Sequence, residues 1–342
     1  MSEIRFCESY QNDIDFSDAL KSCLKEMEMQ EAQQNSLSFS LAAKVKDYMQ
    51  LVKFTLSFTV VFSCVVCYLL VPVISFNLLS VLLLFAGGML ITGSANAINQ
   101  VVEKDTDAMM KRTSGRPVAS GRMSVAEGWT FALVAGVLGV AIMAWRFNML
   151  SAGLGLLSLF LYAFVYTPLK KVNSISVLVG AIPGAMPCLI GWVAGSDTLS
   201  PFEKVPGSDV YNLAGWALFG LQFLWQFPHF FAIAWVAHKD YLKAGFKLLP
   251  SVEGPTAFTA LQSVAYALLM VPVGVLPYWL GISGRISLII VFLANLFMII
   301  QCLRLYKNRD VASARRVMFS SYIYLPVVLL ALLADKAQPH FT

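Results

Sequence analysis

Charged residues are scarce in this sequence of 342 residues, where Asp, Glu, Lys and Arg together contribute only 13%. Apolar residues contribute 58%, and the mean hydropathy is +0.68. Water-soluble globular domains are far more polar, with about 25% charged residues. The composition therefore excludes a soluble protein and predicts an integral membrane protein.

Cysteine and histidine are too few and too dispersed for a zinc centre or a disulfide framework. Cys64 and Cys67 form a CxxC pair inside an apolar segment, where two small packing residues are expected. The patterns GxxxxGK[ST] and GxSxG do not occur. The basic residues are dispersed and balanced by 20 acids, which argues against nucleic-acid binding. The cysteines are Cys7, Cys23, Cys64, Cys67, Cys188 and Cys302, and the histidines are His229, His238 and His340.

Long apolar runs, in contrast, dominate the sequence. A helix needs roughly 17 to 25 apolar residues to cross a hydrocarbon core of about 30 Å. Nine runs meet this requirement, and we predict an all-α membrane protein with a bundle of nine transmembrane helices. The predicted spans are Phe54–Ile74, Leu78–Ile98, Val125–Ala144, Met149–Tyr166, Ile175–Ala194, Leu213–Val236, Phe258–Val275, Ile286–Leu303 and Val317–Leu333.

The distribution of Lys and Arg tests this count, because cytoplasmic loops retain basic residues. The loops after the second, fourth, sixth and eighth spans contain 15 of the 25 basic residues, six precede the first span, and the opposite side contains four. One span added or dropped in the middle of the chain would destroy this asymmetry. We therefore expect the N-terminus in the cytoplasm and the C-terminus outside.

Three parts are expected along the chain. Residues 1–50 contain nine acids and five bases and lack the early apolar core of a secretory signal, so we interpret them as a polar cytoplasmic tail. Residues 51–336 are expected to form the transmembrane domain. Residues 337–342 are expected to form a short outer tail.

The stretch NQVVEKDTDAMMKRTSGRP, residues 99–117, contains three acids and four bases directly after the second apolar run. If the helix continues past the bilayer, Asn99, Glu103 and Asp107 lie at about 0°, 40° and 80° around its axis. Asp105 lies at about 240° and faces elsewhere. Oxygen ligands on one face suit a hard cation such as Mg²⁺, which completes its shell with water and substrate phosphates.

Basic residues follow these acids directly. Arg112 and Arg116 carry the planar guanidinium that binds phosphate oxygens through two hydrogen bonds, and Lys111 and Arg122 lie nearby. The alternative is that this charged loop only solvates a helix end and sets the topology. Acids contribute little to orientation, however, so their helical spacing favours a site for a metal and an anion.

A second polar region, FLWQFPHFFAIAWVAHKDYLKAGFKLLP, covers residues 223–250, where the sixth span meets an inner loop. His229 follows Pro228, which removes a helical hydrogen bond, and a polar group within a span normally lines a cavity. Asp240, with lysines around it, predicts a second site for a metal and an anion. The alternative for His229 is an internally hydrogen-bonded histidine without a ligand.

A third polar region, YTPLKKVNS, covers residues 166–174 after the fourth span. Lys170 and Lys171 lie on the same predicted membrane face as the other two regions. They are candidates for contact with a diphosphate, and the alternative is that they only set the topology.

These motifs resemble those of the UbiA-type intramembrane prenyltransferases. The stretch from Asn99 to Pro117 is similar to their first aspartate-rich motif. The segments RTSGRPVASGR, YTPLKK, GAIPGAMPCLIGW and QFPHFFAIAW followed by DYLKAG are similar to the branch that farnesylates protoheme IX, over roughly residues 45–335. Two positions depart from the pattern: Phe54 stands where the family commonly has proline, and Cys188 replaces a usual second proline.

The resemblance implies transfer of a farnesyl group from farnesyl diphosphate to a vinyl group of protoheme IX (heme B), which yields heme O and releases diphosphate. It implies Mg²⁺ bound with the diphosphate, and heme as a substrate rather than a cofactor. The implied catalytic residues are Asn99, Glu103, Asp107, Arg112 and Asp240, of which Asn99, Glu103, Asp107 and Asp240 hold metal. The implied substrate-binding residues are Arg116, Lys170, Lys171, His229 and Tyr241.

The resemblance also sets expectations for partners and location. His229 is expected to contact heme, with the iron as one target and a diphosphate hydrogen bond as the alternative. Membrane lipid and either a heme A synthase or a terminal oxidase are expected partners, and the bacterial inner (cytoplasmic) membrane is the expected location. Two rival functions remain open: a sister prenyltransferase acting on a quinone precursor or chlorophyll-type ring, and a membrane transporter.

Overall fold

The computed structural model describes residues 21, 24–25, 27, 41–251 and 254–337. Contacts between backbones divide the chain into two units, Met1–Tyr48 and Met49–Thr342, and everything below concerns the second. Its described residues form helices and contain no β-strand beyond two isolated bridges. The helices are α2 (Phe54–Leu70), α3 (Leu78–Val102), α4 (Lys104–Ala108), α5 (Val125–Arg146), α6 (Met149–Phe160), η1 (Leu161–Tyr166), α7 (Thr167–Leu169), α8 (Ser176–Ser196), α9 (Leu213–Val236), α10 (His238–Lys243), α11 (Ala257–Trp279), α12 (Arg285–Asn308) and α13 (Val311–Ala334).

Eight segments of the described chain are long and apolar enough to cross a membrane, with Met149–Leu169 counted as one. A ninth is obtained when α2 is joined to the helix that precedes it. The predicted all-α fold and the positions of the predicted spans are therefore confirmed. The orientation of the two termini stays a prediction, and the predicted tails lie largely outside the described residues.

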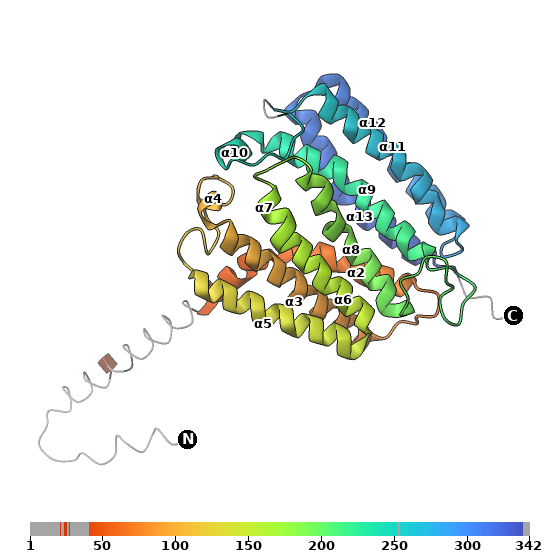
Figure 1. The fold of residues 1–342 in the computed structure, drawn as a ribbon, viewed down its shortest axis with the longest axis horizontal. Helices are drawn as coiled ribbons and strands as arrows, with labels where there is room; N and C mark the ends of the chain where they lie inside the picture. The colour runs from red at the N-terminus through yellow and green to blue at the C-terminus, as the bar shows by residue number, and fades with distance from the viewer. Residues whose placement is uncertain (1–20, 22–23, 26, 28–40, 252–253, 338–342) are drawn as a thin grey trace, which may run out of the picture. The chain divides into compact units, whose positions relative to one another are not determined.

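The spanning helices form one bundle in which neighbours along the chain are mostly neighbours in space (Figure 1). α3 packs against α5, α5 against α6, and α11 against α12, while α13 returns to contact α2. α8 and α9 are the most buried spans, because α8 also contacts α2 and α9 also contacts α13. Polar segments from both halves of the sequence therefore surround a common centre.

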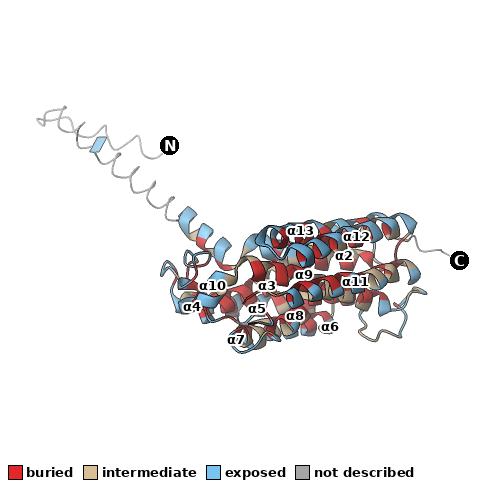
Figure 2. Ribbon diagram, turned by 90° about the horizontal axis from the view of Figure 1, so that it is seen from above, coloured by how far each residue is buried: buried red, intermediate tan, exposed pale blue. Residues whose placement is uncertain are grey.

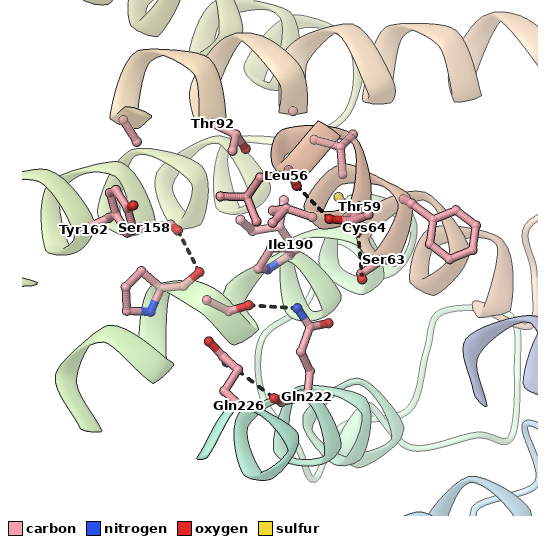
Figure 3. A pocket seen from close by; sticks show the side chains of 18 of the residues that line it. Leu56, Thr59, Ser63, Cys64, Thr92, Ser158, Tyr162, Ile190, Gln222 and Gln226 are labelled. Atoms are coloured by element: carbon pink, nitrogen blue, oxygen red, sulfur yellow. Dashed lines mark hydrogen bonds between the residues drawn. The ribbon is translucent and has the colours of Figure 1, made fainter. Parts of the chain in front are cut away.

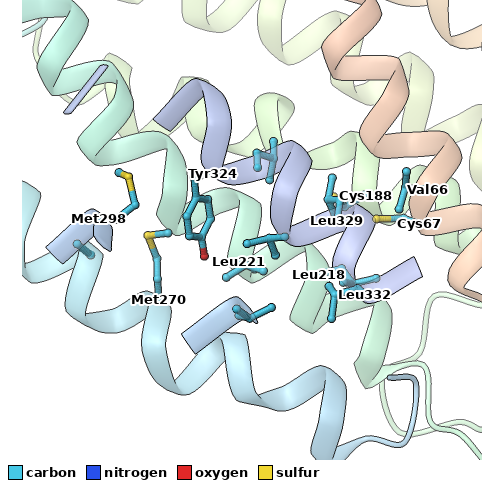
Figure 4. Close-up of a cluster of buried hydrophobic side chains, with 14 of the residues drawn as sticks. Val66, Cys67, Cys188, Leu218, Leu221, Met270, Met298, Tyr324, Leu329 and Leu332 are labelled. Carbon is cyan, nitrogen blue, oxygen red and sulfur yellow. The ribbon is translucent and has the colours of Figure 1, made fainter. Parts of the chain in front are cut away.

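A continuous apolar core joins α9, α11, α12 and α13 and extends to α2 and α8 (Figure 4). Within it, Tyr324 donates a hydrogen bond of 2.6 Å to Asn295 Oδ1, and the Asn295 amide donates to the Met270 carbonyl at 3.2 Å. Membrane helices associate through such packing and hydrogen bonds, since lipid tails are as apolar as the core. These two hydrogen bonds therefore join α11, α12 and α13 within the core.

Residues on the outer surface of the bundle are exposed (Figure 2). Many of these residues are large and apolar. Leu133 and Val137 on α5 are 70% and 61% exposed, and Ile289 on α12 is 59% exposed. A continuous apolar surface of this kind is unfavourable in water and suits contact with lipid.

The connection between the last two spans is shorter than the sequence predicts. α12 extends to Asn308 and α13 begins at Val311, so only Arg309 and Asp310 connect them. Arg309 adopts a left-handed conformation that ends α12, and Asp310 accepts a hydrogen bond of 2.7 Å from the Ser313 backbone N–H as the N-cap of α13. Basic residues expected in a loop therefore extend from helix ends, because a helix can continue past its apolar run.

The C-terminal end of α2 is capped by Lys336, which follows α13. The ammonium of Lys336 donates hydrogen bonds to the carbonyls of Leu69, Val71 and Ile74 at 2.7, 2.8 and 3.0 Å. The last carbonyls of a helix have no partner within it and attract positive charge. Lys336 supplies both the donors and the charge.

Candidate active site

The first charged motif lies where α3 ends. Glu103 is the C-cap of α3, and the short helix α4 carries Asp107. Asn99, Glu103 and Asp107 are 1%, 4% and 0% exposed, whereas Asp105 is exposed. The helical phase expected from the sequence therefore persists across the break between α3 and α4, and three oxygen-bearing side chains face the interior.

Two lysines from other segments contact Asn99 and Glu103. Lys53 Nζ donates a hydrogen bond of 3.0 Å to Asn99 Oδ1, and Asn99 Nδ2 donates one of 2.8 Å to Glu103 Oε2. Lys170 Nζ lies 2.5 Å from Glu103 Oε1. The entry to α2, the end of α3 and the end of α7 therefore converge at one point.

Asp107 is held by the loop that follows it. Arg116 Nη1 donates a hydrogen bond of 2.6 Å to Asp107 Oδ2, and the Thr113 hydroxyl donates one of 2.9 Å to the Asp107 backbone carbonyl. The second carboxylate oxygen, Oδ1, is buried and has no hydrogen-bond partner among the described residues. A buried oxygen without a partner is costly, and this one marks a place for a ligand.

Lys53 was not identified from the sequence. It lies just before α2 in a left-handed conformation, with φ of 49°, and this turn directs its side chain to Asn99 on α3. The sequence showed only a single lysine at the start of an apolar span, next to Phe54, where the family commonly has proline. Its contact across 46 residues of sequence could not be read from that signal.

A change of helical pitch brings the third polar region to the site. Residues Leu161–Tyr166 form a π-helix, and Thr167 follows it directly. Thr167 Oγ1 donates to the Tyr162 carbonyl at 2.9 Å and accepts from Asn99 Nδ2 at 3.2 Å. A π-helical turn shifts the register of the residues after it, which is why such turns occur at functional sites.

Lys170 lies inside the site, and Lys171 does not. The Lys170 ammonium lies 4.9 Å from the ring centroid of Tyr166 and 5.2 Å from that of Phe246. Burial lowers the pKa of Lys170, Glu103 opposes this effect, and the Arg116 guanidinium lowers the pKa further. Arg116 therefore lies within electrostatic range of Lys170. Lys171, which the sequence grouped with Lys170, is exposed.

The second polar region meets the arginine loop through Tyr241. Arg112 Nη2 donates a hydrogen bond of 3.2 Å to the Tyr241 hydroxyl, and the guanidinium lies 5.7 Å from the centroid of its ring. Met110 packs with Phe246 beneath this contact. Among the described residues, the Asp240 side chain has no hydrogen bond or ion pair, and the contact with the arginine loop is made by its neighbour Tyr241.

An apolar cavity of about 690 Å³ lies inside the bundle (Figure 3), and its wall includes residues close in sequence to the charged cluster. Asn96, one turn before Asn99, and Tyr166, one residue before Thr167, form part of its wall. The volume is within the range of about 300–1,000 Å³ that is typical of small-molecule sites. Further lining residues come from α2, α8, α9 and α13, among them Thr59, Cys64, Pro187, Gln222, Gln226, Phe230 and Tyr322.

Three polar side chains on the cavity wall bond to α8, which contains two prolines. Pro187 lacks the N–H that would bond the Pro183 carbonyl, and Ser158 donates to that carbonyl at 3.2 Å (Figure 3). Gln222 donates to the Gly184 carbonyl at 2.8 Å, and Gln226 donates to the Ala181 carbonyl at 2.9 Å. These bonds stabilise the interrupted helix and leave a smooth apolar cavity.

His229 lies on the cavity wall, 9% exposed. Its ring stacks on Trp225 with centroids 4.8 Å apart, and the edge of Tyr322 is nearby at 5.3 Å between centroids. Nδ1 lies 2.8 Å from the Ser321 hydroxyl. The structure thus combines both interpretations of His229, since the ring has an internal hydrogen bond and also faces a cavity.

The residues present fit a magnesium ion that is shared with a substrate. The described chain contains no group of three or more His, Cys, Asp or Glu side chains placed to hold a metal. Two buried carboxylates and an amide lie together, however, and Asp107 Oδ1 lacks a partner. Mg²⁺ typically takes one or two carboxylates and completes its shell with water and substrate phosphates, so this donor set suits it.

Comparison with known proteins identifies the family. The sequence pattern of the UbiA prenyltransferase family matches residues 60–324. The chain belongs to the UbiA prenyltransferase family. The protoheme IX farnesyltransferase of Cytophaga hutchinsonii is 40% identical over 296 residues, which cover 86% of this chain and 99% of that protein. The enzyme class expected from the motifs, a prenyltransferase, is thereby confirmed.

Solved structures of UbiA proteins share the fold. A structure of digeranylgeranylglyceryl phosphate synthase superimposes with a TM-score of 0.69 at 20% identity, covering 86% of this chain and 98% of that chain. A UbiA homologue from Archaeoglobus fulgidus, bound to GPP and Mg²⁺, gives a TM-score of 0.62 at 16% identity, covering 84% of this chain and 99% of that chain. At these identities the likeness concerns the fold alone.

Proposed function

We propose that this protein transfers the farnesyl group of farnesyl diphosphate to a vinyl group of protoheme IX and releases diphosphate, forming heme O. The observation that carries the proposal is a buried cluster of acids and bases beside an apolar cavity, whose wall includes Asn96, Tyr166 and His229. A substrate with an anionic head, an isoprenoid chain and a flat apolar acceptor matches this arrangement. The family membership and the protoheme IX farnesyltransferase relative support the same reaction.

The charges of the cluster suit a diphosphate. Lys53, Arg116 and Lys170 provide three cations, and Glu103 and Asp107 provide two anions. A prenyl diphosphate carries about three negative charges at neutral pH. Cleavage of the allylic C–O bond places further charge on the leaving diphosphate, and cations fixed beforehand stabilise that charge without reorganisation. Arg112, above Tyr241, is proposed to close over the same group.

Magnesium is proposed to bind with the diphosphate. Asn99, Glu103 and Asp107 would hold one ion, and when bound it would neutralise phosphate charge as a Lewis acid. Asp240 is proposed to assist a second ion that is held mainly by the substrate. The related A. fulgidus protein bound to GPP and Mg²⁺ supports a metal-bound diphosphate in this fold. Lys171 is retained only as an outer substrate contact, since it is exposed.

The cavity is proposed to hold the isoprenoid chain and the porphyrin. Its apolar wall would keep water from the allylic cation until the vinyl π electrons attack. One water then adds to the cation left on the porphyrin side and loses a proton, which gives the hydroxyl group of heme O. His229 is proposed to contact the heme iron, with a diphosphate hydrogen bond as the alternative. A multi-pass protein of this kind is proposed to reside in a bacterial inner membrane and to supply heme O to a heme A synthase or a terminal oxidase.

Purified protein in lipid nanodiscs, given Mg²⁺ and farnesyl diphosphate, tests the function directly. We expect a product with the mass of heme O when protoheme IX is added, and stoichiometric diphosphate release. Farnesylation of 4-hydroxybenzoate or of a chlorophyll-type ring instead of heme would favour the sister prenyltransferase. Movement of substrate across the bilayer without diphosphate release would favour a transporter.

Lys53→Met should lower kcat/KM for farnesyl diphosphate by about 100-fold, the usual effect of removing one donor that stabilises developing charge. Methionine retains the apolar stem but cannot donate to Asn99 or to phosphate. The measurement is product formation at several substrate concentrations in nanodiscs. Lys104→Met is the matched control, since Lys104 is exposed beside the same cluster, and it should change kcat/KM less than about twofold. Equal effects of the two changes would remove Lys53 from the site.

A further inference from the structure

His229 and Ser321 face each other across the contact of α9 with α13. Nδ1 of His229 lies 2.8 Å from Ser321 Oγ, and Ser321 is completely buried. Trp225, one turn before His229, stacks on the imidazole and donates its indole N–H to the Ser321 carbonyl at 3.0 Å. The plane of the imidazole and one of its nitrogens are therefore fixed by groups of α9 and α13.

The serine hydroxyl has one proton, and a second contact decides where that proton lies. Ser321 Oγ is also 2.6 Å from the backbone carbonyl oxygen of Met318. Two oxygens at this distance require a proton between them, so the hydroxyl donates to Met318. Toward His229 the hydroxyl oxygen is then an acceptor, and Nδ1 must carry the proton. A neutral imidazole with a proton on Nδ1 has its lone pair on Nε2.

We propose that Ser321 is a positioning residue that holds His229 as the Nδ1–H tautomer, so that Nε2 meets the iron of a metalloporphyrin substrate in the cavity. The inference rests on the proposed function, because that function places a metalloporphyrin beside His229. When a histidine binds a metal, the hydrogen bond made by its other ring nitrogen sets the tautomer and raises the basicity of the nitrogen that binds the metal. Ser321 occupies the place of that partner.

Two porphyrins separate this role from a purely structural one. Ferric protoporphyrin IX offers iron to Nε2, whereas metal-free protoporphyrin IX has the same ring and offers none. The full-length protein in nanodiscs is titrated with each, by absorption for the iron porphyrin and by fluorescence for the metal-free one. We expect the wild-type protein to bind the iron porphyrin more tightly and to shift its Soret band.

Ser321→Ala should weaken binding of the iron porphyrin by about 10-fold, the lower end of the effect of removing such a partner, and should reduce the Soret shift. Binding of the metal-free porphyrin should change less than about twofold, which also verifies that the variant folds. Ser320→Ala, at the adjacent buried serine, is the matched control and should leave both affinities unchanged within about twofold.

Equal weakening of both porphyrins by Ser321→Ala would overturn the inference, because it would indicate a role in packing alone. Unchanged iron-porphyrin binding, or a wild-type protein that binds both porphyrins equally, would overturn it as well. Failure of the proposed function has a different signature, since it appears as a wild-type protein that forms no farnesylated heme, whatever the porphyrin titrations give.

Discussion

Asp107→Asn should lower the rate of heme farnesylation by about 1,000-fold, the upper end of the effect of removing one group that stabilises transition-state charge. The substitution keeps the size of the side chain but removes its charge. It removes the ion pair with Arg116. It also weakens metal binding at Oδ1, the oxygen without a partner that we propose as a metal ligand. The measurement is single-turnover product formation in nanodiscs over a range of Mg²⁺ concentrations. We also expect the Mg²⁺ midpoint to rise.

Asp105→Asn provides the matched control for this change. Asp105 belongs to the same short helix but is exposed, so the substitution alters the local charge without touching the cluster. Its rate should stay within about twofold of wild type. If Asp105→Asn and Asp107→Asn reduced the rate alike, the effect would be one of general charge, and the metal assignment of Asp107 would be wrong.

Arg116→Lys should lower kcat/KM for farnesyl diphosphate by about 100-fold even though the charge is conserved. A guanidinium can bind Asp107 through one N–H and a phosphate oxygen through others, whereas an ammonium is a compact point charge on a more flexible stem. Arg116 Nη1 already donates to Asp107 at 2.6 Å. The expected loss of kcat/KM therefore comes from altered geometry. Steady-state kinetics with farnesyl diphosphate as the varied substrate would measure it.

Arg122→Lys controls for the exchange of arginine for lysine in the same loop. Arg122 is exposed and donates hydrogen bonds to Ser120, Gln50 and the Gly115 carbonyl rather than to the buried acids. We expect a change of less than about threefold. A large loss in Arg122→Lys together with a small loss in Arg116→Lys would reverse the roles proposed for these two arginines.

The spans and the acidic face were predictable because each depends on neighbours along the chain. Apolar runs of the required length predicted where the helices lie, and a period of 3.6 residues predicted that Asn99, Glu103 and Asp107 share one face while Asp105 points elsewhere. In the structure the first three are buried and Asp105 is exposed. These are local properties, and they survived even the break in the helix at Glu103.

The remainder of the site depends on contacts between distant segments, and the sequence contains no direct record of them. The bond between Lys53 and Asn99 spans 46 residues, and the bond between His229 and Ser321 spans 92. The π-helix before Thr167 has no distinctive residue pattern, and the sequence did not distinguish the buried Lys170 from the exposed Lys171 after it. The sequence suggested both Asp240 and Tyr241, and tertiary packing gives Tyr241 the hydrogen bond with Arg112.

The lysine that closes α2 has a consequence for biosynthesis. Lys336 lies between 262 and 267 residues after the carbonyls that it binds, so those carbonyls lack this partner until the chain has been synthesised as far as Lys336. Contacts between such remote positions form late, because a long loop must close first. The C-terminal end of α2 therefore gains this contact only after α13 has been synthesised, so a chain shortened before residue 336 would leave these three carbonyls without the ammonium.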